Sequence, residues 1–309
     1  MFGMSTHKGR VALILMIAVA AGCGAARGQD DSLEYKCPIL DSPYRTANRA
    51  YQGLEVGFLP ASKTSADWGD VLQGEAGVWG EWFYWENEVG GDILVRGLLD
   101  ATWLSGSPGE DAQGGVEDWI SRPLTMARVS VQWSQRFVEG FGLQMEAMPG
   151  LYTGFESLKS DDVAVPMRLQ LIKAFSSEFA VFAGATVYPR FEQSVDPLLG
   201  VALLRRDWMS LTVAYPESRL VLGPPKGIRL AGGARFWRWQ QYNLGDDDRE
   251  YIRLHDSRVY GGLELGRPGA LEVVLHGGYA FNREIEFGDD TTVEIDNAPY
   301  FRIGFNGLY

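Results

Sequence analysis

The chain has 309 residues and a formal net charge of −12; 46% of the residues are hydrophobic and 22% are charged. This balance excludes an intrinsically disordered chain and a bundle of apolar transmembrane helices, and the negative charge argues against nucleic-acid binding. The high content of aromatic residues (12%) and glycine (38 residues) is typical of an all-β protein rich in turns.

The N-terminus has the organisation of an export signal. Lys8 and Arg10 precede the apolar run Val11–Ala21, and small residues follow it as far as Gly28. A helix that crosses a bilayer needs about 20 apolar residues, and this run is shorter. We therefore predict a signal peptide over residues 1–28 rather than a buried core helix.

Two modes of cleavage fit this signal. Ala20-Ala21-Gly22-Cys23 resembles a lipobox, which makes Cys23 a candidate for lipidation, whereas Ala26-Arg27-Gly28 fits ordinary signal peptidase cleavage before Gln29. We favour the second mode. Cys37 is then the only cysteine that remains, so no internal disulfide can form.

Residues 29–48 are polar without a clear period and are predicted to form a periplasmic lead-in segment. From residue 49 to residue 309, apolar and polar residues alternate in stretches separated by turn-forming residues. The clearest strand is Leu271–Phe287, whose odd-numbered residues, Arg283 included, share one mostly apolar face. The ranges 123–137, 141–151 and 165–175 repeat this pattern.

Less regular strands complete the expected sheet. They are predicted over 50–60, 73–86, 92–104, 178–190, 197–206, 207–216, 227–241, 257–266 and 298–309, with Arg219–Leu222 as a short additional candidate. Short links near residues 87–91, 139–140, 176–177, 206–207 and 268–269 tend to alternate with long links at 62–71, 105–122, 153–164, 242–256 and 288–297. Because an outer-membrane barrel has short turns on one side and long loops on the other, we predict a closed antiparallel transmembrane β-barrel of 12–14 strands.

Aromatic residues also distinguish a membrane barrel from a soluble β-sandwich. Several predicted strands are longer than sandwich strands, and tryptophans gather near their ends, where a barrel places its aromatic girdles in the headgroup layers. The candidates for these girdles are Trp82, Trp85, Trp103, Trp133, Trp208, Trp237 and Trp239.

The last segment has the pattern of a closing strand. Phe301, Ile303, Phe305 and Tyr309 share one face, and the chain ends on an aromatic ring. This resembles the C-terminal signal that the barrel-assembly machinery recognises in outer-membrane proteins. The expected partners are therefore outer-membrane lipid and that machinery, and the expected location is the bacterial outer membrane.

Several short motifs occur in an order that resembles one family of bacterial envelope proteins. They are Met148-Pro149-Gly150-Leu151-Tyr152, Val187-Tyr188-Pro189-Arg190, Val213-Ala214-Tyr215-Pro216 and Arg283-Glu284-Ile285-Glu286-Phe287. The family is an outer-membrane β-barrel family of unknown function, and the resemblance covers about residues 50–309. It implies a fold and a location but no catalytic residues.

The sequence offers little evidence of catalysis. His276 lies on the polar face of its predicted strand, His255 falls in the predicted connection 242–256, and no sequence feature pairs either with a nucleophile. The adjacent residues Asp246, Asp247 and Asp248 lack the alternating spacing of a calcium loop. We expect no enzyme activity, no catalytic residues, no cofactor and no metal.

Charged residues on the polar strand faces are the candidates for the lumen. They include Arg96, Asp100, Arg128, Glu146, Arg168, Glu272, His276 and Arg302. This mixture of signs fits a small-solute channel of porin-like type, with small polar solutes as its partners, and equally a closed-lumen structural or surface-interaction barrel braced by ion pairs. A secreted or lipid-anchored soluble β-sandwich that acts as a binding module is a third reading.

Overall fold

The protein is described here from a computed structural model. The structure describes residues 51–64, 70–86, 91–106, 123–137, 140–154, 159–191, 195–205, 208–224, 226–243, 251–266, 271–288 and 291–308. The predicted signal peptide, Cys23, the lead-in segment, Tyr309 and the side chains of Trp237 and Trp239 lie outside this description. Among the described residues, no helix is long and apolar enough to cross a membrane.

Among the described residues, the regular structure is β-strand apart from the short 3-10 helix η2 (Ser160–Asp162). The first nine strands are β1 (Tyr51–Lys63), β2 (Asp70–Glu86), β3 (Gly91–Gly106), β4 (Pro123–Arg136), β5 (Phe141–Ala147), β6 (Gly150–Thr153), β7 (Val163–Ala164), β8 (Met167–Ala174) and β9 (Phe179–Val187). The other eight are β10 (Val195–Arg205), β11 (Met209–Tyr215), β12 (Glu217–Leu222), β13 (Gly227–Asn243), β14 (Tyr251–Gly266), β15 (Glu272–Phe287), β16 (Thr292–Ile295) and β17 (Ala298–Leu308).

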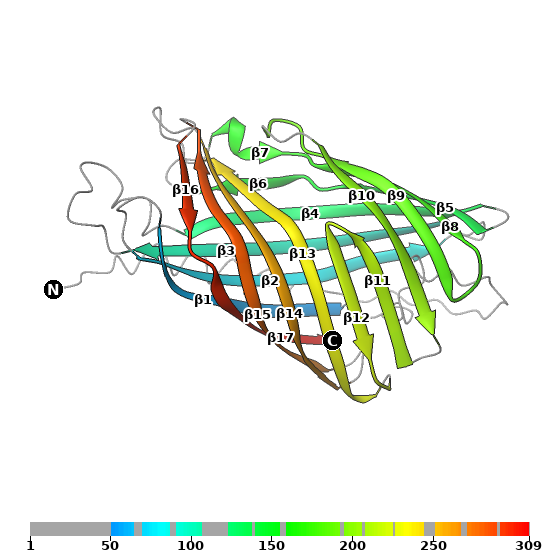
Figure 1. The fold of residues 1–309 in the computed structure, drawn as a ribbon. Coiled ribbons are helices and arrows are strands. Elements are labelled where there is room, and N and C mark those ends of the chain that lie inside the picture. The colour runs from blue at the N-terminus through cyan, green and yellow to red at the C-terminus, as the bar shows by residue number, and fades with distance from the viewer. Residues whose placement is uncertain are drawn as a thin grey trace.

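These strands form one closed antiparallel barrel, because β1 pairs with β2 on one side and with β17 on the other (Figure 1). Three of the barrel's strands are interrupted: Pro149 separates β5 from β6, Pro166 separates β7 from β8, and residues 296–297 separate β16 from β17. Proline has no N–H to donate to a ladder, which accounts for the first two breaks. Counted with these breaks joined, the barrel has 14 strands. The predicted 12–14 strands are confirmed, and the sandwich reading is wrong.

One sequence prediction is corrected by a β-bulge. The ladder between β14 and β15 shifts register between His255 and Ser257, and Asn282 opposite this shift has a positive φ of 50°. The bulge reverses the alternation, so Arg283, Ile285 and Phe287 are buried instead of sharing the outward face of Leu275. Alternation alone carries no sign of such an extra residue.

A second register shift lies in β2. It falls between Glu81 and Phe83, so Trp82 and Phe83 are both exposed, and the Trp82 ring covers Gly97 of β3. A Cβ on Gly97 would overlap this ring. Only glycine fits under this ring without a shift.

The strand boundaries differ from expectation mainly at the end with long connections. His255 lies within β14 rather than in a connection, and β16 occupies part of the predicted link 288–297. The short candidate at Arg219–Leu222 is a strand, β12. The strands on either side of the predicted links 62–71, 153–164 and 242–256 extend further than the sequence pattern indicates.

The end with long connections is filled by apolar side chains, here called the apolar cluster. Its members are Val71, Leu104, Leu124, Met126, Tyr152, Ala164, Phe191, Tyr242, Ile252, Leu254, Ile285, Phe287, Val293 and Ile295. At the same end β13 meets β6 directly: Asn243 pairs with Thr153, and the Gly154 N–H donates to the Asn243 carbonyl over 3.0 Å. The lumen is therefore narrowed and dry at this end.

The outer surface is a broad apolar band. Alternate residues of successive strands project outward and are exposed, among them Leu54, Val56, Phe58, Leu169, Leu171, Leu199, Val213, Ile228, Leu230, Leu275, Phe301, Ile303 and Phe305. Soluble proteins rarely expose contiguous apolar surface of this extent.

Candidate functional site: the charged lumen

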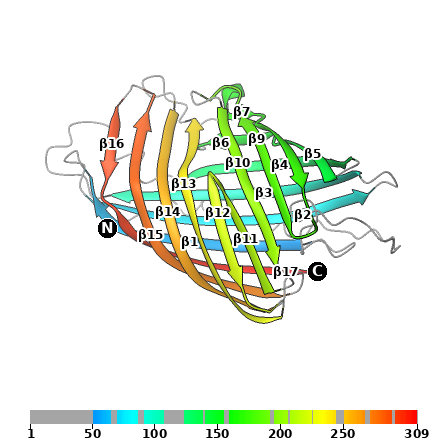
Figure 2. The ribbon, with the colours of Figure 1, turned by 45° about the vertical axis from the view of Figure 1, so that its right-hand side comes forward.

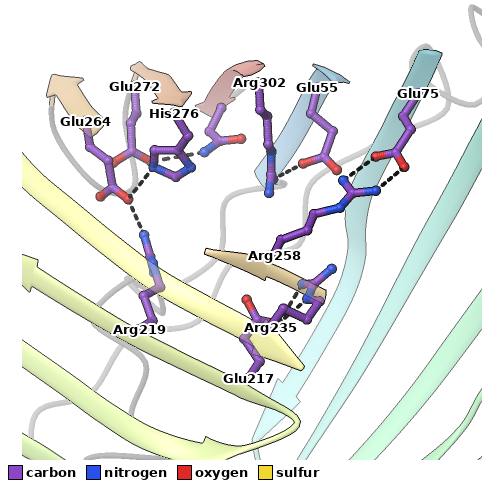
Figure 3. A network of polar contacts seen from close by, with 11 residues as sticks. Glu55, Glu75, Glu217, Arg219, Arg235, Arg258, Glu264, Glu272, His276 and Arg302 are labelled. Carbon is purple, nitrogen blue, oxygen red and sulfur yellow. Dashed lines mark hydrogen bonds and ion pairs between the residues drawn. The ribbon is translucent and has the colours of Figure 1, made fainter. Parts of the chain in front are cut away.

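Ion pairs line the lumen in the half with short turns (Figure 3). Glu264 of β14 accepts from Arg219 of β12, and its other carboxylate oxygen lies 2.9 Å from Nη2 of Arg229 on β13. Arg229 also pairs with Glu272 of β15, whose second oxygen accepts from the Asn306 amide at 3.0 Å. Because these residues come from β12 to β17, one network joins neighbouring strands around this part of the wall.

Arg258 extends the network across the barrel. It pairs with Asp256 on its own strand and with Glu75 of β2, at 2.6 Å between Nη2 and Oε1. In the ring of strands β14 and β2 are separated by β15, β17 and β1, so this contact bridges the interior. All three side chains are largely buried, which makes their mutual compensation necessary.

Arg283 occupies the level between this network and the apolar cluster. Its guanidinium donates to Ser62 Oγ at 3.0 Å and to the Asp296 carbonyl at 2.8 Å. It thus joins β15 to β1 across β17. The bulge at Asn282 is what turns this arginine inward.

A row of polar residues continues around the opposite wall, here called the polar row. Gln132, Glu146, Arg168, Thr186 and Asp196 are direct partners across β4, β5, β8, β9 and β10. Arg168 lies 3.4 Å from the Glu146 carboxylate and donates from Nε to Thr186 Oγ1 at 3.3 Å.

Tyr188 lies just beyond β9 at the end of this row. Burial, together with the nearby Asp196 carboxylate, raises the pKa of Tyr188 to about 12. The phenol therefore stays neutral at physiological pH and acts as a polar, uncharged group.

Several of these inward-facing charged side chains are open to solvent. The side chains of Glu217 and Arg235, which pair at 2.5 Å, are 40% and 37% exposed, and those of Arg219 and Arg168 are 38% and 41% exposed. By contrast, every member of the apolar cluster is at most 9% exposed. Water therefore reaches the charged part of the lumen and is excluded from the cluster.

The structure gives each of the remaining lumen candidates from the sequence a specific neighbour. Arg96 pairs with Glu81 (3.1 Å), Asp100 lies beside Gly77, and Arg128 approaches the Met148 sulfur (3.8 Å). Arg302 pairs with Glu55, and His276 lies 3.8 Å from Glu264 and stacks on Tyr260. His276 is thus held beside a carboxylate. Among the described residues, no group of three or more metal-ligating side chains is present.

The tryptophan candidates lie on the outer side where they are described. Trp82, Trp85, Trp103 and Trp208 are exposed, and Trp133 is half-buried. Beside the short turns, further exposed rings continue the series: Phe137, Phe141, Phe175 and Phe179. Lys173 lies over the Phe141 ring at 3.9 Å from its centroid.

Sequence reasoning missed much of the charged network. The lumen candidates from the sequence do not include Glu55, Glu75, Arg219, Arg229 or Arg258, because the partners of these residues are far away in the sequence. Arg258 and Glu75, for example, are 183 positions apart. Alternation along β1, β2 and β13 is the signal that could place Glu55, Glu75 and Arg229 on the inward face.

Comparison with known proteins gives fold likenesses only. No family model matches the chain, and no curated protein matches it. An outer-membrane channel from Pseudomonas putida F1 is 10% identical over 91% of this chain and 100% of that one, with a TM-score of 0.45. The TodX monoaromatic hydrocarbon channel is 8% identical over 84% and 90%, with a TM-score of 0.43. A porin mutant from Rh. blastica is 9% identical over 84% and 99%, with a TM-score of 0.30.

Because all three TM-scores are below 0.5, these likenesses establish neither the fold nor the function of this chain. Its barrel fold rests on its own strand pairing. No family model supports the resemblance to a family of barrels of unknown function. The closed barrel that this resemblance implied is nevertheless the fold observed.

Proposed function

We propose that the protein is a bacterial outer-membrane barrel that acts as a passive, non-enzymatic channel for small polar solutes. The observation that carries the proposal is the partly solvent-exposed charge inside the barrel. Both side chains of the Glu217–Arg235 pair are exposed, and so is Arg168, which pairs with the largely buried Glu146. Charged groups that keep contact with water mark a hydrated interior.

The membrane location is supported by the outer surface. Outward residues such as Leu171 (62% exposed) and Leu199 (66% exposed) form an apolar band, and exposed rings gather beside the short turns. Apolar strands flanked by aromatic girdles are the pattern of transmembrane barrels. Residues 1–28 supply the expected export signal.

Insertion into the membrane is proposed to depend on the last strand. Phe301, Ile303 and Phe305 of β17 project outward from the strand that closes the barrel against β1. This is the face that we propose the barrel-assembly machinery recognises, before outer-membrane lipid covers it.

Liposome swelling tests the channel. Purified protein in liposomes is expected to admit glycine and small sugars faster than larger sugars, because the lumen of a 14-stranded barrel narrowed by ion pairs is small. Empty liposomes are the control. Swelling rates equal to those of empty liposomes for every solute would contradict the proposal.

A closed-lumen structural barrel is the second candidate, and the buried bridge from Arg258 to Glu75 favours it. That bridge braces opposite parts of the wall whether or not solutes pass. If it closes the lumen, Glu75→Gln is expected to raise the swelling rate and to lower resistance to heat. If a hydrated path exists beside it, only the heat resistance falls.

A further inference from the structure

The barrel wall contains a break above the hairpin of β11 and β12. The ladder from β10 to β11 ends at Leu199 and Tyr215, and the ladder from β12 to β13 ends at Glu217 and Arg235. Strand β10 begins four residues before Leu199, and β13 continues for eight residues after Arg235. At about 3.3 Å per residue, β13 extends roughly 26 Å past the hairpin.

Nothing in the strand pairing closes this break. Among the described residues, no ladder joins β10 to β13 directly. Beyond Arg235, the Phe236 N–H still donates to the Pro216 carbonyl at the tip of the hairpin (2.8 Å). From there on β13 pairs with β14 and meets β6 through Asn243 and Thr153. In both ribbon views the hairpin stops short of its two neighbours (Figure 2).

The residue types fit a permanent edge. Pro197 lies in β10 above the last β11 pair, and it has no N–H to donate sideways. Proline is confined to edge strands, first residues or bulges within sheets, and edge strands otherwise offer unpaired N–H groups. Strand β10 thus has the composition of an edge at this level.

Polar side chains lead inward from the break. The polar row ends at Asp196 of β10, one residue before Pro197. The exposed pair of Glu217 and Arg235 lies at the other border, on the last pair of the β12–β13 ladder. The axial route, by contrast, runs into the apolar cluster.

We propose that this break is a lateral, water-filled portal through which small polar solutes reach the lumen. The inference rests on the proposed channel function and names its outer entrance. Backbone that is not paired within a sheet is tolerated at membrane depth only where it is buried in protein or lines water. The charges at both borders favour water over lipid as the occupant.

A cysteine at Leu198 tests the portal in the full-length protein. Leu198 is an inward-facing, half-buried residue of β10 at the break. The variant Leu198→Cys is made in a Cys23→Ala, Cys37→Ser background, which removes both natural cysteines. Conductance in planar bilayers is recorded before and after a charged methanethiosulfonate reagent, and again after reduction.

Two adjacent residues of β16 serve as controls. Val293 is buried in the apolar cluster, whereas Glu294 is exposed on the outer side of the same strand. The portal predicts that Val293→Cys stays unlabelled and that Glu294→Cys is labelled without a change in conductance. Leu198→Cys is expected to be labelled and to lose more than half of its conductance, reversibly.

The remaining outcomes overturn the portal and can be told apart from failure of the channel. Labelled Leu198→Cys with full conductance shows that solutes pass elsewhere. Labelling by a lipid-soluble maleimide alone shows that the break opens to lipid. In both cases an unmodified protein that conducts leaves the channel function standing, whereas an unmodified protein that never conducts removes the channel and its entrance together.

Discussion

The inward-facing side chains are charged at one end of the lumen and apolar at the other. Toward the short turns the inward positions carry arginine and glutamate, such as Arg219 and Glu264, and part of this charge is open to water. Toward the long connections they carry residues such as Phe287 and Ile252, both fully buried. The same alternation of strand residues thus produces a wet half and a dry half. The contrast shows that apolar side chains can fill the lumen at the end with long connections while charged, partly hydrated side chains line it at the end with short turns.

The largest expected effect comes from the buried bridge within the charged half. Arg258→Ala leaves the carboxylates of Glu75 and Asp256 buried without their cation. Such a loss typically costs about 3–5 kcal/mol. Urea unfolding of the detergent-solubilised protein measures it. A loss below about 1 kcal/mol would show that the bridge contributes little and that water replaces the guanidinium.

A comparable effect is expected in the dry half. Ile285→Ala removes a fully buried side chain from the apolar cluster, at a typical cost of about 2–5 kcal/mol. The matched control is Ile303→Ala, whose side chain is outward and 39% exposed. Urea unfolding in the same detergent compares the two variants. Equal losses would contradict a packed interior at this end.

A smaller effect tests the bulge that separates the two halves. Asn282 has a positive φ of 50°, a conformation that β-branched residues rarely adopt. Asn282→Val is expected to cost about 1–2 kcal/mol, whereas Asn282→Gly keeps the stability near that of the wild type. The difference between these two variants in thermal unfolding is the measurement. A valine variant as stable as the glycine variant would argue against the bulge.

The smallest effect is expected for an open pair. Arg96 and Glu81 lie 3.1 Å apart, and their side chains are 39% and 23% exposed. Arg96→Ala is therefore expected to cost about 0–1 kcal/mol. Measured beside Arg258→Ala, it gives the contrast between a hydrated and a buried pair. A loss as large as that of Arg258→Ala would place Arg96 in a dry environment.

The sequence predicted the barrel well because alternation is a local property. Strands such as β4 and β17 lie within a residue or two of their predicted limits, and the short candidate Arg219–Leu222 lies within β12. The face of each strand was harder to predict wherever a bulge intervenes. Arg283 was assigned to the apolar face for this reason.

The site itself was predicted only in part. Placing Glu272 or His276 on a polar face requires one strand, and alternation supplies that. Pairing Arg258 with Glu75 requires the curvature and shear of the whole barrel, which no local pattern contains. The apolar cluster could not be predicted because its members come from strands far apart in the sequence.

Planar-bilayer recording of the wild-type protein tests the central claim most directly. If the charged half of the lumen is a hydrated path that connects with the outside, repeated insertions give discrete, uniform conductance steps in potassium chloride. A flat baseline across many verified insertions would show instead that the ion pairs and the apolar cluster together seal the barrel.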